Sequence, residues 1–143
     1  MEPSDAARYF FEAGTLPFII LGTVHMLVAV GEVFRPRLLT PRDDHVREAM
    51  CATSLRLRRG WAMWPAWLGF NITHGLGLVF FGLVLLLIAV DDFRVVAALD
   101  VLMPLAVAVS VTYVVLAIRF FFNLPAVVSA VGAACFIASY ALL

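Results

Sequence analysis

Four long apolar stretches run along the chain, separated by short polar segments. None of the stretches alternates polar and apolar positions, as the strands of an outer-membrane barrel do. A run of about 20 apolar residues is long enough to cross a bilayer as a helix. The pattern therefore predicts an all-α integral membrane four-helix bundle, with residues 1–143 forming a single transmembrane domain. The predicted spans are residues 15–34, 64–90, 95–118 and 120–143.

The loop between the first two spans carries a weaker pattern of its own. Thr40 and Pro41 resemble the start of a helix, with threonine as the N-cap and proline at the first helical position. Apolar residues then recur near helical spacing among charged ones. We predict a short amphipathic helix over residues 41–58 that lies on the cytoplasmic face, where its arginines reach anionic headgroups. The alternative is a plain loop whose arginines only set the topology.

Composition supports the membrane assignment. The 143 residues are 64% hydrophobic and 14% charged, with a mean hydropathy of +1.01, whereas soluble domains are roughly 45–50% apolar and about 25% charged. A soluble domain of this size hides only about 70% of the surface of its unfolded chain, so the lipid bilayer is the expected partner. Ten basic residues balance ten acidic ones, and this lack of a basic excess argues against nucleic acid.

Arginine placement predicts the orientation. The first loop and the turn between the last two spans share one side and carry eight of the ten arginines. By the positive-inside rule this side is cytoplasmic, so both termini lie outside a bacterial inner (plasma) membrane. Aromatic and basic residues mark the membrane interface at the start of the second span. These interface residues are Trp61, Trp64, Trp67, Arg56, Arg58 and Arg59.

Polar side chains inside the spans are the candidate site, because ionisable groups at this depth usually face the bundle interior. His25 lies near the middle of the first span, and Glu32 lies on the same helical face seven residues later. Every span can contribute a polar group to a layer in the cytoplasmic half. The predicted ligand- or cofactor-binding residues are His25, Glu32, Asn71, His74, Tyr113 and Asn123.

Five of these six residues also have a structural explanation. Asn71 and Asn123 lie near helix starts, where they can bond free backbone groups, and Tyr113 fits an interfacial belt. Glu32 can pair with an interfacial arginine, and His74 can hydrogen-bond between helices. The last span adds alanines at i+4 spacing, which let two helices approach closely, within one chain or between two copies. These alanines are Ala126, Ala130, Ala134 and Ala138.

One segment resembles a known group of proteins. Residues 64–78, Trp-Pro-Ala-Trp-Leu-Gly-Phe-Asn-Ile-Thr-His-Gly-Leu-Gly-Leu, together with Gly22-Thr-Val-His25, are similar to an uncharacterised family of small four-span bacterial membrane proteins. That family has a Gly-Phe-Asn-x-Ser/Thr-His-Gly segment, and its layout is distantly similar to that of DoxX-like proteins. The resemblance covers about half of the chain. It implies the four-span architecture and points to Asn71 and His74, but it implies no reaction.

Several functions remain open from these residues. The first is binding of a small ligand or cofactor in the polar layer between the helices. The others are an accessory subunit of a larger membrane complex, a bis-His haem or redox protein, and a membrane isomerase-type enzyme. A homo-oligomer is open as well. Cys51 and Cys135 do not form a metal-type pair, so no metal site is predicted. The sequence identifies no cofactor and does not decide whether the protein is an enzyme.

Overall fold

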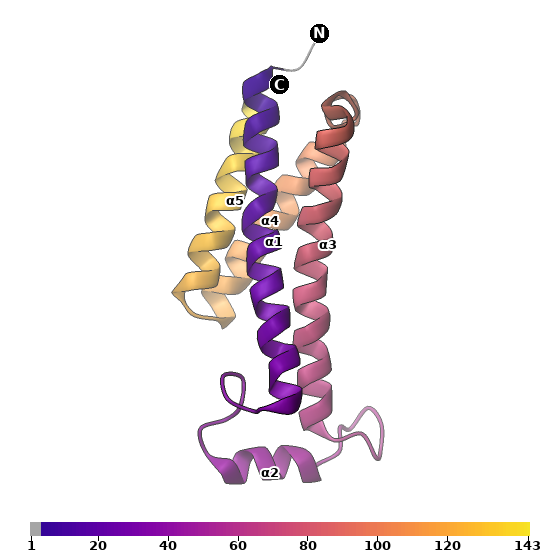
Figure 1. Cartoon of the computed structure of the whole chain (residues 1–143), viewed down its shortest axis with the longest axis vertical. Coiled ribbons are helices and arrows are strands. Elements are labelled where there is room, and N and C mark those ends of the chain that lie inside the picture. The colour runs from indigo at the N-terminus through magenta and orange to yellow at the C-terminus, as the bar shows by residue number, and fades with distance from the viewer. Residues whose placement is uncertain (1–3) are drawn as a thin grey trace. The chain divides into compact units, whose positions relative to one another are not determined.

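The computed structural model describes residues 4–143, and the described chain is entirely helical apart from its loops and one isolated β-bridge. Its helices, in chain order, are α1 (Asp5–Phe34), α2 (Asp44–Ala52), α3 (Met63–Ala98), α4 (Leu102–Phe120) and α5 (Asn123–Ala141) (Figure 1). All but α2 are long and apolar enough to cross a membrane. The all-α class is therefore confirmed, with four span candidates and a short helix between the first and second.

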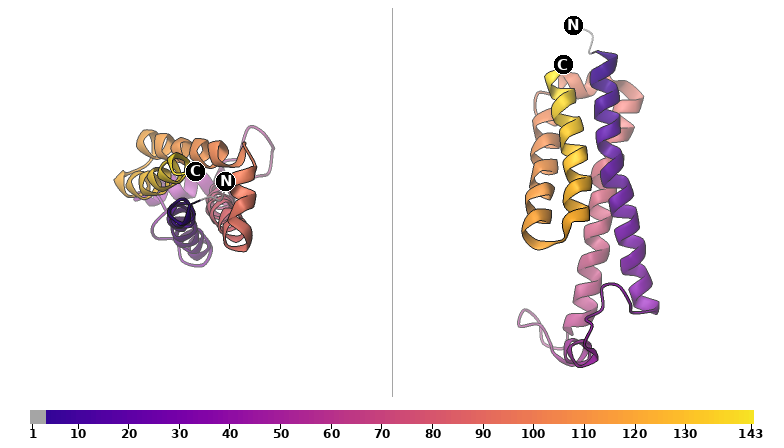
Figure 2. Two further views of the ribbon diagram at one scale, coloured as in Figure 1. Left: turned by 90° about the horizontal axis from the view of Figure 1, so that it is seen from above. Right: turned by 90° about the vertical axis from the view of Figure 1, so that its left-hand side faces the viewer.

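The chain forms two compact units that share the two longest helices. The second unit is Gly22–Gly77, which holds the later part of α1, all of α2 and the first part of α3. The first unit takes the chain up to Leu21 and from Leu78 onward, so it holds the start of α1, the end of α3, and α4 and α5. In this first unit α4 and α5 run side by side in opposite directions (Figure 2).

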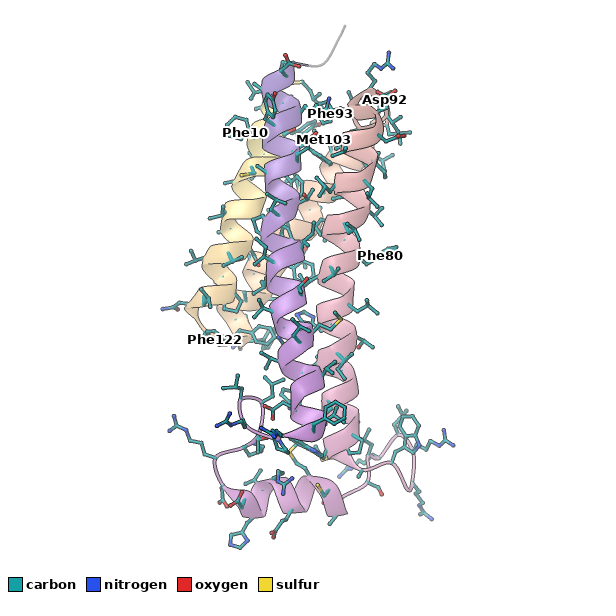
Figure 3. The ribbon with its side chains drawn as sticks, in the orientation of Figure 1. Phe10, Phe80, Asp92, Phe93, Met103 and Phe122 are labelled. Carbon is teal, nitrogen blue, oxygen red and sulfur yellow. The ribbon has the colours of Figure 1, made fainter. Side chains whose placement is uncertain are left out.

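Aromatic side chains form the core of the first unit. Phe11 and Phe136 are fully buried and meet edge to face, with ring centroids 5.2 Å apart. Phe93 and Met103 extend this core near the far end of α3 (Figure 3). Burying one large apolar side chain contributes about 1.5–3 kcal/mol in water, but in lipid close packing must supply much of the stability.

Small residues bring α5 against α1 within the first unit. A Cβ placed on Gly132 would lie 3.1 Å from the carbonyl oxygen of Gly14, so the two backbones are in close contact. Nearby, the buried Ser139 hydroxyl donates a 2.7 Å hydrogen bond to the carbonyl oxygen of Ala7. The predicted alanine stripe is not this contact face, because Ala130 and Ala134 are exposed.

A break divides α3 near its end. Asp92 has φ −152° and ψ 100°, which is extended rather than helical backbone. Its carboxylate accepts the backbone N–H of Arg94 at 3.0 Å and so caps the short helical segment that follows. Residues 93–98 form that segment, and α4 begins only at Leu102. Residues 95–98, predicted as the start of the third span, therefore belong to this short segment before α4.

The first helix begins earlier than its apolar run. Ser4 caps it, because the Ser4 hydroxyl oxygen accepts the N–H of Ala7 at 3.1 Å. Arg8 and Glu12 then pair across one turn at 2.7 Å. These polar first turns explain why the apolar pattern alone placed the start near Thr15.

Apolar side chains cover the outer surfaces of the long helices. Phe80 is 67% exposed and points outward from α3 (Figure 3), and Phe122, in the turn between α4 and α5, is 66% exposed. Water would penalise so much exposed apolar surface, whereas hydrocarbon does not. The spans therefore contact the lipid bilayer.

In the second unit α2 lies across the ends of its two longer helices (Figure 1). It is shorter than predicted, and its N-cap is Asp43, whose carboxylate accepts the N–H of His45 at 2.9 Å. Thr40 was the predicted cap, but its hydroxyl is bonded instead to Glu32, at 2.7 Å. The helix ends at Ala52, because the following residues turn into a hairpin.

Candidate functional site

The later part of α1 and the first part of α3 present one small-residue face each. On α1 the face carries buried Gly22 and Ala29 on either side of His25. On α3 it carries buried Asn71 and Gly75 beside His74. Residues three, four and seven apart lie on one side of a helix, so Gly22 and Ala29 share a face with His25, and Asn71 shares one with His74.

Gly75 sets the closeness of the two helices beside the histidines. A Cβ at Gly75 would lie 2.8 Å from the backbone nitrogen of Met26 and 3.0 Å from the carbonyl oxygen of Gly22. Distances this short leave no room for a side chain. Because Met26 follows His25 and Gly75 follows His74, the tight contact holds the two histidines next to each other.

His25 and His74 contact each other directly. Their rings lie edge to face, with centroids 5.3 Å apart and planes at 84°. Phe70 lies parallel to His74 on its own helix, with centroids 6.3 Å apart. Both histidines are half-buried rather than enclosed. The pair therefore places two imidazoles side by side.

Asn71 is the third member of the cluster. It is 5% exposed, and its side-chain amide donates to the carbonyl oxygen of Trp67 at 2.8 Å. Asn71 also lies beside His25, close enough to interact with its ring. The other side of the imidazole has no such contact, because the Nε2 atom of His25 is buried without a hydrogen-bond partner among residues 4–143. Asn71 therefore interacts with the His25 ring, while the Nε2 atom of that ring has no partner within residues 4–143.

Glu32 holds the chain that leaves α1. Its side chain is 2% exposed, and its carboxylate accepts the N–H groups of Arg37, at 2.9 Å, and of Leu38. The same carboxylate accepts the Thr40 hydroxyl at 2.7 Å. Both carboxylate oxygens of Glu32 thus accept hydrogen bonds from the loop, so Glu32 closes a turn instead of pairing with an arginine side chain. Nothing in the sequence signalled this role.

Tyr113 and Asn123 belong to the first unit, whereas His25, Glu32, Asn71 and His74 belong to the second. Tyr113 is half-buried beside Phe18, with ring centroids 5.8 Å apart. Asn123 is exposed at the first position of α5. The predicted polar layer spanning all four helices stays a prediction.

The three predicted interface tryptophans have different surroundings. Trp64 is 8% exposed, whereas Trp61 is 57% exposed and lies under the Arg58 guanidinium at 5.2 Å. Trp67 donates its indole N–H to the carbonyl oxygen of Leu39 at 3.2 Å. Trp67 therefore ties α3 to the segment after α1, while Trp61 remains open to its surroundings.

The histidine pair does not fit a haem held between two axial ligands. Such a haem needs an imidazole on each side of the macrocycle, whereas these two rings touch and the backbones beside them are in contact at Gly75. For metal ions, no group of three or more His, Cys, Asp or Glu side chains gathers in the part of the chain that the structure describes.

A pocket at the break in α3 was not foreseen from the sequence. It has a volume of about 210 Å³ and belongs to the first unit. Ser4, Asp5, Arg8, Asp91, Asp92, Phe93 and Arg94 line it. Its two arginines already pair with carboxylates, Arg8 with Glu12 and Arg94 with Asp92. Asp91 and Asp92 lie between the predicted second and third spans, and this pair of adjacent acids is the signal in the sequence that could have indicated the pocket.

The fold and the apolar surface define a small multi-span membrane protein with four span candidates. Comparison of the chain with protein-family models, with curated proteins and with solved structures found no match in any of the three.

Proposed function

We propose that this chain is a bacterial inner-membrane protein that binds a small lipid-soluble molecule at His25 and His74, with Asn71 orienting His25. The observation that carries the proposal is the buried Nε2 atom of His25, which has no hydrogen-bond partner within residues 4–143. A polar group left unpaired in a bilayer costs several kcal/mol. A ligand hydroxyl or amide N–H that donates to this nitrogen removes that cost.

The surroundings favour an apolar ligand with one polar end. Gly22, Met26 and Gly75 meet in the helix contact next to the pair, and the ring of Phe70 stacks on His74. Sites for small molecules combine a mostly apolar lining with a few polar groups that fix orientation. The resemblance of residues 64–78 to a family of small four-span proteins is in keeping with this proposal, since it includes both Asn71 and His74.

We place the loop between α1 and α3 in the cytoplasm and both termini outside. The support is the eight arginines on the loop side against Arg8 and Arg94 on the other.

The test uses protein extracted gently from its own membrane. Native mass spectrometry and an absorption spectrum are recorded for the wild type, His25→Ala and His74→Ala. The matched control is His45→Ala, which removes the third histidine from the exposed surface of α2. We expect a retained small molecule in the wild type and the control and its loss from both pair variants. Equal retention in all four proteins would reduce the pair to a helix contact.

An accessory subunit of a larger membrane complex is the second candidate. The observation that favours it is the exposure of Ala130 and Ala134 on α5, because small residues on a lipid-facing helix allow another helix to approach. Co-migration with larger subunits in the same extract, lost on Ala134→Leu, supports this candidate. Migration as a lone chain removes it.

A further inference from the structure

Residues 53–62, between α2 and α3, fold into a hairpin, which we call the arginine hairpin. Its two arms pair through the N–H of Leu55 and the carbonyl of Trp61 at 2.8 Å, and through the N–H of Met63 and the carbonyl of Thr53 at 3.0 Å. Gly60 makes the return with φ +82°, a left-handed conformation that glycine adopts without strain. The hairpin therefore presents its tip in a defined shape.

The tip carries concentrated positive charge with no acid to balance it. Arg56, Arg58 and Arg59 are all exposed, and residues 53–62 contain no Asp or Glu. Within residues 4–143 none of these three arginines forms a salt bridge to a carboxylate. Three neighbouring guanidinium groups repel one another unless an anion lies between them.

Apolar groups accompany the charge. Leu57, between two of the arginines, is 94% exposed, and Trp61 is 57% exposed under the Arg58 guanidinium. An exposed leucine and tryptophan beside arginines suit a surface that is apolar below and anionic above. The hairpin also leads directly into the first turn of α3, which is a membrane span.

We propose that the arginine hairpin is a binding site for anionic phospholipid headgroups, with the guanidinium groups on the phosphate and Leu57 and Trp61 in the upper acyl region. Arginine binds phosphate through paired N–H donors. Charge complementarity chooses this occupant, since anionic lipids are the abundant anions at a cytoplasmic membrane surface. The site is separate from the histidine pair and does not depend on its ligand.

The test is a lipid titration of the whole, delipidated protein in zwitterionic micelles. Phosphatidylglycerol or phosphatidylcholine is added, and bound lipid is measured by native mass spectrometry. We compare the wild type with Arg56→Gln/Arg58→Gln/Arg59→Gln. The matched control is Arg35→Gln/Arg37→Gln/Arg42→Gln, which removes the same charge from exposed positions of the same loop.

The hairpin variant is expected to bind phosphatidylglycerol roughly 100-fold more weakly, because each of the three arginines near a membrane surface contributes about a fivefold factor. The control variant is expected to change far less. Equal losses in the two variants, equal binding of both lipids by the wild type, or release of the lipid by an equal concentration of inorganic phosphate would each overturn the proposal.

A second variant keeps the test decisive if the triple substitution fails to fold. Leu57→Glu changes one side chain that is 94% exposed and leaves every arginine in place. The new carboxylate would compete with the phosphate for the guanidinium groups, so binding of phosphatidylglycerol should fall severalfold. Unchanged binding would overturn the proposal.

Discussion

The carboxylate of Glu32 and the hydroxyl of Thr40 are joined by a 2.7 Å hydrogen bond that closes the turn after α1. The same carboxylate accepts two backbone N–H groups of that turn. A residue that sequence reasoning placed among ligand-binding groups therefore organises the chain between the first span and α2. The same turn includes Leu39, whose carbonyl oxygen accepts the indole N–H of Trp67 on α3.

Removing the Glu32 carboxylate should loosen this turn without moving the histidine pair. For Glu32→Gln we expect faster amide hydrogen exchange at Arg37 and Leu38, because their hydrogen bonds lose a charged acceptor, worth about 1.5–3 kcal/mol each. Thr40→Val removes only the hydroxyl and should cost about 1 kcal/mol. Hydrogen exchange read by mass spectrometry checks both variants. Unchanged protection in Glu32→Gln would show that the carboxylate does not hold the turn.

The α1–α3 contact beside the histidines should be intolerant of a single methyl group. Gly75→Ala places a Cβ 2.8 Å from the backbone nitrogen of Met26, so the helices must separate, at a cost of about 1–3 kcal/mol. Gly77→Ala is the matched control, since a Cβ there meets nothing within 4 Å and helix propensity improves by up to about 1 kcal/mol. Thermal unfolding in micelles should separate the two variants by several degrees. Equal melting temperatures would contradict the packing described for Gly75.

The hydrogen bond between α5 and α1 should make a small, measurable contribution to stability. Ser139→Ala removes the donor to the Ala7 carbonyl, and interhelical hydrogen bonds in membranes average about 0.6 kcal/mol. Thr112→Val is the control, because the exposed Thr112 hydroxyl bonds only within its own helix, to Ala108 at 2.8 Å. Unfolding titrations in mixed micelles measure the difference. A larger loss for Thr112→Val than for Ser139→Ala would contradict this assignment.

The proposed orientation can be tested with a native cysteine. Cys51 is exposed on α2, whereas Cys135 is half-buried in α5. In a Cys135→Ser background, a membrane-impermeant maleimide should label Cys51 only after the cells are opened, because the arginine-rich loop side is expected in the cytoplasm. Labelling of Cys51 in intact cells would reverse the orientation. Moving three or four loop arginines to the other side should disturb the topology in the same assay.

Sequence patterns predicted helix faces better than helix ends. Gly22 and Ala29 lie at helical spacing from His25, and both are buried on its face of α1. The start of α1 was missed, because Ser4 and the Arg8–Glu12 pair extend the helix through polar turns. The predicted spans stop at residue 90 and resume at residue 95, but the cap that Asp92 places on Arg94 was not predicted, since it depends on backbone angles that hydropathy does not report.

For the candidate site, the sequence could predict only which residue types lie at a similar depth in the membrane, and not which of them are in contact. The sequence placed His25 and His74 about 5 Å apart along the membrane normal, but whether their rings meet depends on how two helices cross. The tight approach at Gly75 decides that point. The same limit applied to Thr40, which resembled a helix cap until the structure placed Glu32 within hydrogen-bonding distance of its hydroxyl.

The central claim, that a ligand occupies the free ring nitrogen of His25, is tested most directly by ¹⁵N NMR of histidine-labelled protein. Spectra are recorded after gentle extraction and again after exhaustive detergent exchange that strips small molecules, with His25→Gln and His45→Gln assigning the signals. We predict that stripping shifts the Nε2 signal of His25 and leaves that of His45 unchanged. A His25 signal that is identical in both samples, from protein shown by mass spectrometry to have lost a bound molecule, would contradict the account.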